Sequence, residues 1–422
     1  MEDIAQYVQK LGQSARKAAG DLAALNDGAK TAVLKKIAAA IVENRQALLD
    51  ANAKDVEAAV AGQMAPALIE RLKLNDKRIN GMAEGVLQIA GQTDPVGQII
   101  EGYVRPNGLR ITKMRVPLGV VLFFYESRPN VTSDAAALCI KSGNAIILRG
   151  GKEAFHSNKA IVAIVADALK AGGVDPAAVQ FVESTDRALV PQLLKLDKYI
   201  DLVIPRGGES LIRAVVKDST IPVLKHFTGN CHLYIDAGAE AMEADVRKVC
   251  VNAKTSYPGG AVCNAVEHLL FHKDVAPKLL AKVCEDLTAK GVEVRGDERA
   301  RAIYSSAKPT IPEDWDTEYL AFVVGVKVVD SIDEAIAHIN EHGSHHTDGI
   351  LSTNRAAIDK FVTRVDSASV MINASTRFAD GGEFGLGAEI GISTDKLHAR
   401  GPMGANDLTT YKWVVSGEGH VR

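Results

Sequence analysis

The spacing of apolar residues changes along the chain and predicts a helical layer first. From Ile4 to about Gly91 the sequence is rich in alanine, and Leu34, Ile37 and Ile41 recur at helical spacing with lysine and glutamate opposite them. The alternation between residues 101 and 114 around Pro106-Asn107-Gly108 then predicts an extended hairpin.

Short, continuous apolar runs alternate with helical stretches after this hairpin. Val116 to Tyr125 is the first run, and the alternation repeats to about residue 215. A second block of the same kind begins near Asn230 and extends to Ile372. Buried strands that alternate with helices predict parallel sheets covered on both faces, so we expect an α/β protein with a doubly wound dinucleotide-type domain.

Composition narrows the class of partner. The 422 residues include 49 basic and 52 acidic side chains, a net charge of -3 that favours neither nucleic acid nor an anionic membrane. The five cysteines show no CxxC spacing, which predicts a reducing, cytoplasmic environment. Residues 1–17 contain no apolar signal segment, and no apolar run approaches the roughly 18 residues of a membrane span.

Cys263 is the candidate nucleophile. It follows Pro258-Gly259-Gly260, a turn that must end the helix predicted before it, and a buried strand from Val266 follows. A thiol in a loop held between two packed elements is well placed to react. The alternative is a cysteine that acts as a small buried hydrophobe.

Two basic glycine turns are candidates for phosphate binding. Arg149-Gly150-Gly151-Lys152 and Arg206-Gly207-Gly208 each follow a predicted strand and precede a helix. Ligands bind at that edge of a parallel sheet, and the first N–H groups of a helix hold anions. The GxGxxG fingerprint is absent from both turns, and solvated basic residues are the alternative.

The polar segment Glu126-Ser127-Arg128-Pro129-Asn130-Val131-Thr132 is a third candidate site, because it lies between an apolar strand and a helix. Helix capping by Asn130 or Thr132 is the alternative.

A histidine-rich segment from His338 to Asp348 suggests a metal site at first sight. His338 and His342 share a helix face, but Gly343 ends the helix and no cysteine or second histidine pair completes a zinc set. We therefore expect no metal, and a structural or substrate-facing role.

Four blocks in register resemble the aldehyde dehydrogenase superfamily, and within it the gamma-glutamyl phosphate reductase family. The similarity spans nearly the whole chain. The blocks are 126–132, Phe227-Thr228-Gly229-Asn230-Cys231-His232, the segment from Val329 to Asp348, and Asn373-Ala374-Ser375-Thr376-Arg377-Phe378 with 383–389.

The resemblance implies an aldehyde dehydrogenase-like fold with a cofactor domain, a catalytic domain and an oligomerisation hairpin. We expect the following segments: 1–98, a helical layer and the start of the cofactor domain; 99–116, the hairpin; 117–229, the NADPH-binding domain; 230–370, the catalytic domain with Cys263; 371–404, a return to the cofactor domain; and 405–422, an oligomerisation strand.

The implied reaction is NADPH-dependent reduction of L-glutamyl 5-phosphate to L-glutamate 5-semialdehyde and phosphate, in proline biosynthesis. Cys263 would form a thioester, and its N–H with the Asn130 amide would bind the oxyanion. Residues 227–229 replace the glutamate that activates water in oxidising members, and His226 or a neighbour stands there instead. This replacement favours a reductase.

The resemblance also assigns binding roles. Arg149 and Lys152 suit the 2'-phosphate of NADPH, and Glu318 matches the glutamate that holds the nicotinamide ribose, with a surface carboxylate as the alternative. Arg128 and Arg377 are expected to bind the phosphate or α-carboxylate of the substrate, because guanidinium groups bind either in a bidentate way.

Two further functions stay open at this point: another oxidation or acylating reaction of the superfamily, and a non-catalytic dinucleotide-binding protein. A homo-oligomer is expected, and glutamate 5-kinase is an implied partner because the acyl phosphate is unstable.

Overall fold

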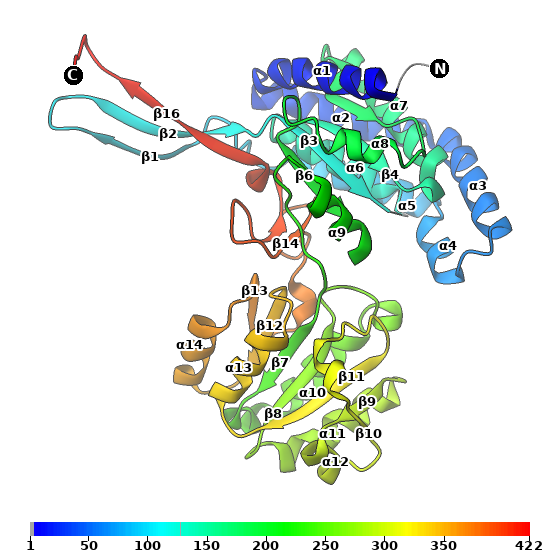
Figure 1. The fold of residues 1–422 in the computed structure, drawn as a ribbon, viewed down its shortest axis with the longest axis vertical. Helices are drawn as coiled ribbons and strands as arrows, with labels where there is room; N and C mark the ends of the chain where they lie inside the picture. The colour runs from blue at the N-terminus through cyan, green and yellow to red at the C-terminus, as the bar shows by residue number, and fades with distance from the viewer. Residues whose placement is uncertain (1–3, 127) are drawn as a thin grey trace. The chain divides into compact units, whose positions relative to one another are not determined.

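The computed structural model describes residues 4–126 and 128–422, which form two compact units (Figure 1). Unit 1 contains the described residues up to Lys225, together with Gly385–Gly391 and Met403–Arg422. Unit 2 contains His226–Phe384 and Ile392–Pro402. The chain therefore passes between the units more than once, and each unit has its own parallel sheet.

Unit 1 opens with the helical layer that the periodicity predicts. Its helices are α1 (Ile4–Ala23), α2 (Asp27–Glu43), α3 (Arg45–Ala61), α4 (Pro66–Leu72) and α5 (Asp76–Ala90). Two ion pairs made by buried lysines hold this layer: Lys30 Nζ lies 2.8 Å from Asp94, and Lys141 Nζ lies 2.6 Å from the exposed Asp27 carboxylate. Both lysines are fully buried, so loss of either partner would leave a charge without compensation.

A four-stranded parallel sheet forms the rest of the unit 1 core, in the order β5-β4-β3-β6. All six residues of β3 are buried, as expected of a strand covered on both faces. The strands are β3 (Val120–Tyr125), β4 (Ala145–Gly150), β5 (Val179–Phe181) and β6 (Leu202–Arg206), and the helices are α6 (Asn130–Lys141), η1 (Lys152–Ala154), α7 (Phe155–Ala171), η2 (Pro176–Ala178), α8 (Leu189–Leu193) and α9 (Glu209–Asp218).

Unit 2 is built on a seven-stranded parallel sheet in the order β10-β9-β11-β8-β7-β12-β13. Alternate residues of a strand enter different cores: Leu233 and Ile235 of β7 lie in one apolar cluster, and Tyr234 lies in another. The strands are β7 (Cys231–Ile235), β8 (Val266–His272), β9 (Glu293–Gly296), β10 (Lys308–Pro309), β11 (Val323–Val329), β12 (Thr347–Leu351) and β13 (Ser369–Ile372).

Helices cover both faces of this sheet. Residues of α10, α11 and α12 belong to one core cluster, and residues of α13 and α14 belong to the other. The helices of unit 2 are η3 (Ala237–Met242), α10 (Glu243–Thr255), η4 (Pro258–Gly260), α11 (Ala276–Ala289), α12 (Glu298–Ile303), η5 (Pro312–Asp316), α13 (Ile332–His342), α14 (Arg355–Arg364) and η6 (Thr376–Phe378). The doubly wound α/β prediction is therefore confirmed.

The predicted hairpin is formed by β1 (Ile99–Val104) and β2 (Arg110–Pro117), which pair in an antiparallel register. β16 (Thr409–Ser416) adds to the other edge of β2 and completes a three-stranded sheet (Figure 1). The remaining elements are β14 (Gly391–Ser393), β15 (Gly401–Met403) and η7 (Ala405–Leu408). The role of the three-stranded sheet in oligomerisation stays a prediction.

The structure corrects the segment boundaries in two places. Residues 371–384 and 392–402 were expected in the cofactor domain but belong to unit 2, because β13 is the edge strand of the seven-stranded sheet and η6 contacts β12 and α10. Helix α6 begins at Asn130, so the last three residues of the polar segment 126–132 belong to its first turn. Ser127 and the first three residues of the N-terminal segment lie outside the described residues. Across residues 4–126 and 128–422, no helix is long and apolar enough to cross a membrane.

Candidate active site

Cys263 lies in the loop between η4 and β8, as the sequence predicts. Helix α10 ends before Ser256, and Gly259 and Gly260 then adopt φ values of 70° and 67°. Residues other than glycine rarely adopt this left-handed conformation, so the glycine pair allows the sharp reversal that leads to Cys263. Cys263 is half-buried, whereas the other four cysteines are buried.

A buried ion pair holds both ends of this loop. Lys254, in the last turn of α10, lies 2.7 Å from Glu267, the second residue of β8, and both side chains are fully buried. Burial raises the pKa of Glu267 to about 8 although Lys254 opposes that shift. The pair connects the helix before the loop to the strand after it, and so limits where Cys263 can lie.

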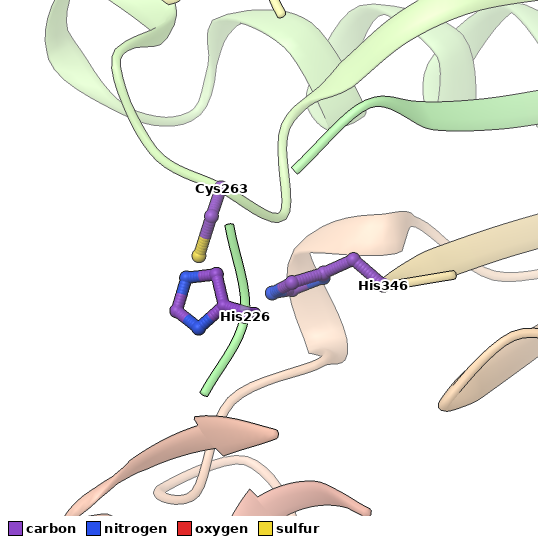
Figure 2. A group of neighbouring side chains, drawn as sticks. All are labelled: His226, Cys263 and His346. Carbon is purple, nitrogen blue, oxygen red and sulfur yellow. The ribbon is translucent and has the colours of Figure 1, made fainter. Parts of the chain in front are cut away.

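Two histidines flank the Cys263 sulfur. The ligand atoms of His226, Cys263 and His346 all lie within 4.8 Å of one another. Figure 2 shows the His226 ring beside the sulfur and the His346 ring directed toward the same place. His226 is the first residue of unit 2, and His346 immediately precedes β12. Three distant segments of one unit therefore meet at the thiol.

These imidazoles change the acidity of the thiol. Burial alone would raise the pKa of Cys263, but the adjacent His346 and His226 imidazoles outweigh burial and hold the pKa well below its usual value. The reactive form of cysteine is the thiolate. The arrangement is thus suited to nucleophilic attack at neutral pH.

The hydrogen bonds of the two rings define which nitrogens face the sulfur. His226 Nδ1 lies 2.8 Å from the carbonyl oxygen of Ile392, which only accepts, so Nδ1 carries a proton and Nε2 is left for the site. His346 Nδ1 lies 2.9 Å from Thr347 Oγ1, and His346 Nε2 is buried without a hydrogen-bond partner in the described chain.

The backbone of Cys263 is held by the segment that precedes β7. A Cβ atom on Gly229 would overlap the carbonyl oxygen of Cys263, so only glycine fits at this close approach. The Cys231 thiol donates to the same carbonyl oxygen, at 3.1 Å. Residues 227–229 supply no carboxylate, and His226 occupies the place beside the sulfur.

Glu318 also belongs to this site. Burial raises its pKa, the charge of Cys263 raises it further, and the Gly229 N–H opposes the shift by donating a hydrogen bond. Glu318 is therefore a half-buried carboxyl near the nucleophile and not a surface carboxylate. Its role in holding a nicotinamide ribose stays a prediction.

Arg377 packs on the nucleophile loop. Its Nε lies 3.2 Å from Ser256 Oγ, and its guanidinium lies 5.7 Å from the centre of the Tyr257 ring. Because η6 places this cation beside the loop that holds Cys263, the predicted role of Arg377 in substrate binding has a suitable location.

The other predicted site residues lie in unit 1. Asn130 Nδ2 donates to Asp134, at 3.1 Å, and burial raises the pKa of Asp134 to about 6. The Arg128 N–H donates to the carbonyl oxygen of Glu126. The structure thus places Asn130 and Arg128 together at the start of α6, and their roles toward oxyanion and substrate stay predictions.

The two glycine turns lie at the carboxyl ends of β4 and β6, which pair with opposite edges of β3. The Arg149 guanidinium donates to the carbonyl oxygens of Gly150, at 2.6 Å, and of Thr185, at 3.2 Å, whereas Lys152 is exposed. Lys152 is therefore the freer cation at this edge. Gly207 packs against the Glu126 carboxyl, and Gly208 is the N-cap of α9.

A family model described as the aldehyde dehydrogenase family matches residues 3–302. A curated gamma-glutamyl phosphate reductase from Moorella thermoacetica is 49% identical over 420 residues, 100% of each chain. The chain belongs to the aldehyde dehydrogenase family, in its gamma-glutamyl phosphate reductase branch.

Solved structures agree with this membership. The gamma-glutamyl phosphate reductase from Thermotoga maritima has a TM-score of 0.95 at 46% identity, over 98% of this chain and 99% of that one. An engineered glycolyl-CoA reductase with bound NADP+ has a TM-score of 0.69 at 15% identity, over 97% of each chain, which shows the fold alone. Aldehyde dehydrogenases use a nicotinamide dinucleotide.

Sequence reasoning missed several residues of this aldehyde dehydrogenase site. His346 lay inside the histidine-rich segment, but nothing in its spacing separated it from His338, which the structure places elsewhere in the unit 2 core. Gly229 and the Lys254–Glu267 pair gave no local signal. The hints were the place of Gly229 inside the second family block and of Lys254 at an apolar helix position.

Proposed function

We propose that this protein reduces L-glutamyl 5-phosphate to L-glutamate 5-semialdehyde with NADPH, releasing phosphate, in proline biosynthesis. The observation that carries the proposal is the Cys263 thiol between two imidazoles, with no carboxylate at residues 227–229. A thiolate attacks an acyl phosphate readily, and a site without a water-activating base there protects the resulting thioester. Identity of 49% to a gamma-glutamyl phosphate reductase supports the same substrate.

In the first half of the reaction, the Cys263 thiolate attacks the acyl carbon and forms a C–S bond. The oxyanion of the tetrahedral intermediate needs fixed donors, and the Cys263 N–H with the Asn130 amide are the proposed pair. Collapse breaks the bond from carbon to the phosphate oxygen and leaves a thioester on Cys263. Arg377 and Arg128 are proposed to bind the charged ends of the substrate.

In the second half, the thioester is reduced to a thiohemiacetal, which then breaks its C–S bond to release the aldehyde. When bound, NADPH supplies the hydride for this step. As the C–S bond breaks, the electron pair returns to the Cys263 sulfur, where His226 and His346 stabilise the thiolate again. The same two rings therefore assist both attack and departure of sulfur.

The residues of unit 1 fit a nicotinamide dinucleotide. A Cβ on Gly208 would meet only open space, and Gly208 precedes the first N–H groups of α9, so an anion has access to them. The exposed Lys152 is our proposed partner of the 2'-phosphate, with Arg149 as a less available second cation. Glu318 is proposed to hold the nicotinamide ribose.

The reverse reaction tests the proposal. Glutamate 5-semialdehyde and NADP+ are supplied with and without phosphate, and NADPH is followed by absorbance. Turnover that requires phosphate supports the reductase, whereas phosphate-independent oxidation indicates another reaction of the family. Cys263→Ser is expected to abolish turnover, and Cys284→Ala, in the α11 core, is the matched control that retains it.

The assembly and location of the enzyme are further parts of this proposal. The sheet of β1, β2 and β16 exposes apolar side chains, including Val104, Trp413 and Val415, which suits pairing with a second copy. Val415→Glu is expected to shift the light-scattering mass toward a smaller species, and an unchanged mass would contradict this.

Five free thiols suit the cytoplasm. Glutamate 5-kinase remains the proposed partner, to be tested by co-purification.

A further inference from the structure

The three side chains around the nucleophile are also a suitable set of metal ligands. We propose that His226, Cys263 and His346 form a three-ligand site for Zn²⁺, which binds reversibly and blocks the nucleophile. Thiolate and imidazole are the ligands that Zn²⁺ prefers, and three protein ligands leave the fourth position of a tetrahedral ion open. The proposal concerns the free enzyme and does not depend on which substrate is reduced.

The geometry is close to that of a bound ion. Zn–S and Zn–N distances of about 2.3 and 2.0–2.1 Å put the ligand atoms of a tetrahedral site roughly 3.3–3.8 Å apart. The ligand atoms here lie within 4.8 Å of one another, so rotations that move each by about 1 Å suffice. Figure 2 shows the three side chains converging on one place, so all three ligands are already close together.

Hydrogen bonds already orient the two rings as they are oriented in metal sites. A ligating histidine usually donates its other N–H to a carbonyl or carboxylate. His226 Nδ1 donates to the carbonyl oxygen of Ile392, and the ring lies beside the Cys263 sulfur. His346 Nε2 is fully buried and has no hydrogen-bond partner in the described chain, and an ion would satisfy it.

Charge also favours a dication here. Zn²⁺ would form a Zn–S bond with the Cys263 thiolate, with no change in oxidation state. Glu318 lies near enough for its charge to interact with that of Cys263, so the site contains two acidic groups that attract a dication. The Cys231 thiol donates to the Cys263 carbonyl oxygen and lies 3.9 Å from His346 Nδ1, so it contacts groups other than the Cys263 sulfur.

Cobalt provides a direct test, because Co²⁺ takes zinc sites and a Co–thiolate bond gives a near-ultraviolet charge-transfer band. The metal-free protein is titrated with Co²⁺, then with Zn²⁺. We expect one equivalent of Co²⁺ to produce the band, Zn²⁺ to remove it, and Zn²⁺ to protect Cys263 from iodoacetamide until EDTA is added. Peptide mass spectrometry identifies the labelled cysteine.

Variants distinguish Co²⁺ binding by all three side chains from Co²⁺ binding by a thiolate alone. His226→Asn and His346→Asn are each expected to weaken Co²⁺ binding about 100-fold or more, since even outer-shell partners of a metal ligand contribute 10–100-fold. His342→Asn, a histidine of unit 2 paired with Asp316, is the matched control that retains the band. Circular dichroism confirms that each variant is folded. A band that survives both substitutions, or labelling that Zn²⁺ does not slow, would overturn the proposal.

Discussion

The buried histidines of unit 2 predict that this unit loses stability in mild acid. His338, on α13, is 5% exposed, and its ring centre lies 4.5 Å from that of His342 and 5.6 Å from that of His232. Lys327 Nζ lies 3.4 Å from His338 Nδ1, and the Trp315 ring packs at 5.3 Å. Burial is the main cause that lowers the pKa of His338, and the charges of His232, Lys327 and His342 lower it further, to about 2.

The sign and size of the stability change follow from the linkage between proton binding and folding. Below its ordinary pKa of about 6.5, the His338 ring is protonated in the unfolded chain but stays neutral in the folded one, so folding becomes less favourable as the pH falls. Each pH unit below that value costs about 1.4 kcal/mol until the folded pKa is reached. At pH 5.0 the loss from His338 alone is therefore about 2 kcal/mol. Burial also lowers the pKa of His268, which acts in the same direction.

The chain offers a local reporter for this effect. Its two tryptophans are Trp315, beside His338, and Trp413, on β16 of unit 1. In a Trp413→Phe background, urea unfolding followed by fluorescence reports on unit 2 at pH 7.5 and 5.0. His338→Phe is expected to reduce the loss of unfolding free energy between these pH values by about 2 kcal/mol. If the unfolding free energy fell equally in the parent and the variant, the folded protein would have to protonate His338 as easily as the unfolded chain does. That result would refute the low pKa of His338 as the cause.

Two further predictions concern the backbone around the nucleophile. Gly229→Ala is expected to lower kcat about 100-fold, because the added Cβ would displace the Cys263 carbonyl group. A displacement of about 1 Å in the reacting groups can lower the rate by that factor. Near-normal turnover and near-normal labelling of Cys263 by iodoacetamide would contradict this prediction. Lys254→Met is expected to cost about 3–5 kcal/mol of unfolding free energy by leaving Glu267 buried without its partner. Adding Glu267→Leu should restore most of that loss in urea unfolding, and a double variant as unstable as the single one would argue against the pair.

The helices and strands were predictable because the local order of apolar, polar and turn-forming residues indicates which segments are buried and where they end. The unbroken apolar run of β3 has all six residues buried, and Pro106-Asn107-Gly108 joins β1 to β2 in the expected hairpin. The division of residues 371–404 was not predictable. Strand β13 pairs with β12, the strand before it, and ends the block that was expected to extend to Ile372. The segment after it joins unit 2 because η6 contacts β12 and α10, and nothing in the three residues of η6 specifies those partners.

The site was predictable as far as single residues reveal their chemistry. Cys263 follows the turn Pro258-Gly259-Gly260, which the proline and the two glycines predict. His226 was noted because it stands where oxidising members of the family have a glutamate that activates water. His346 was not identified, because its ring reaches the thiol only when β12 lies next to β7, and strand order is a property of the whole sheet.

Arg149 shows why residue type at a strand end does not settle a binding role. Its guanidinium has five N–H donors, and the sequence offers no way to count the carbonyl groups that will use them. In the structure the carbonyl oxygens of Gly150 and Thr185 accept from it, while Lys152, two residues beyond the strand end, remains exposed. A cation already held by the backbone must give up those hydrogen bonds before it binds a phosphate. Replacing Lys152 should therefore affect the preference for NADPH more than replacing Arg149, whose removal would first disturb the turn itself.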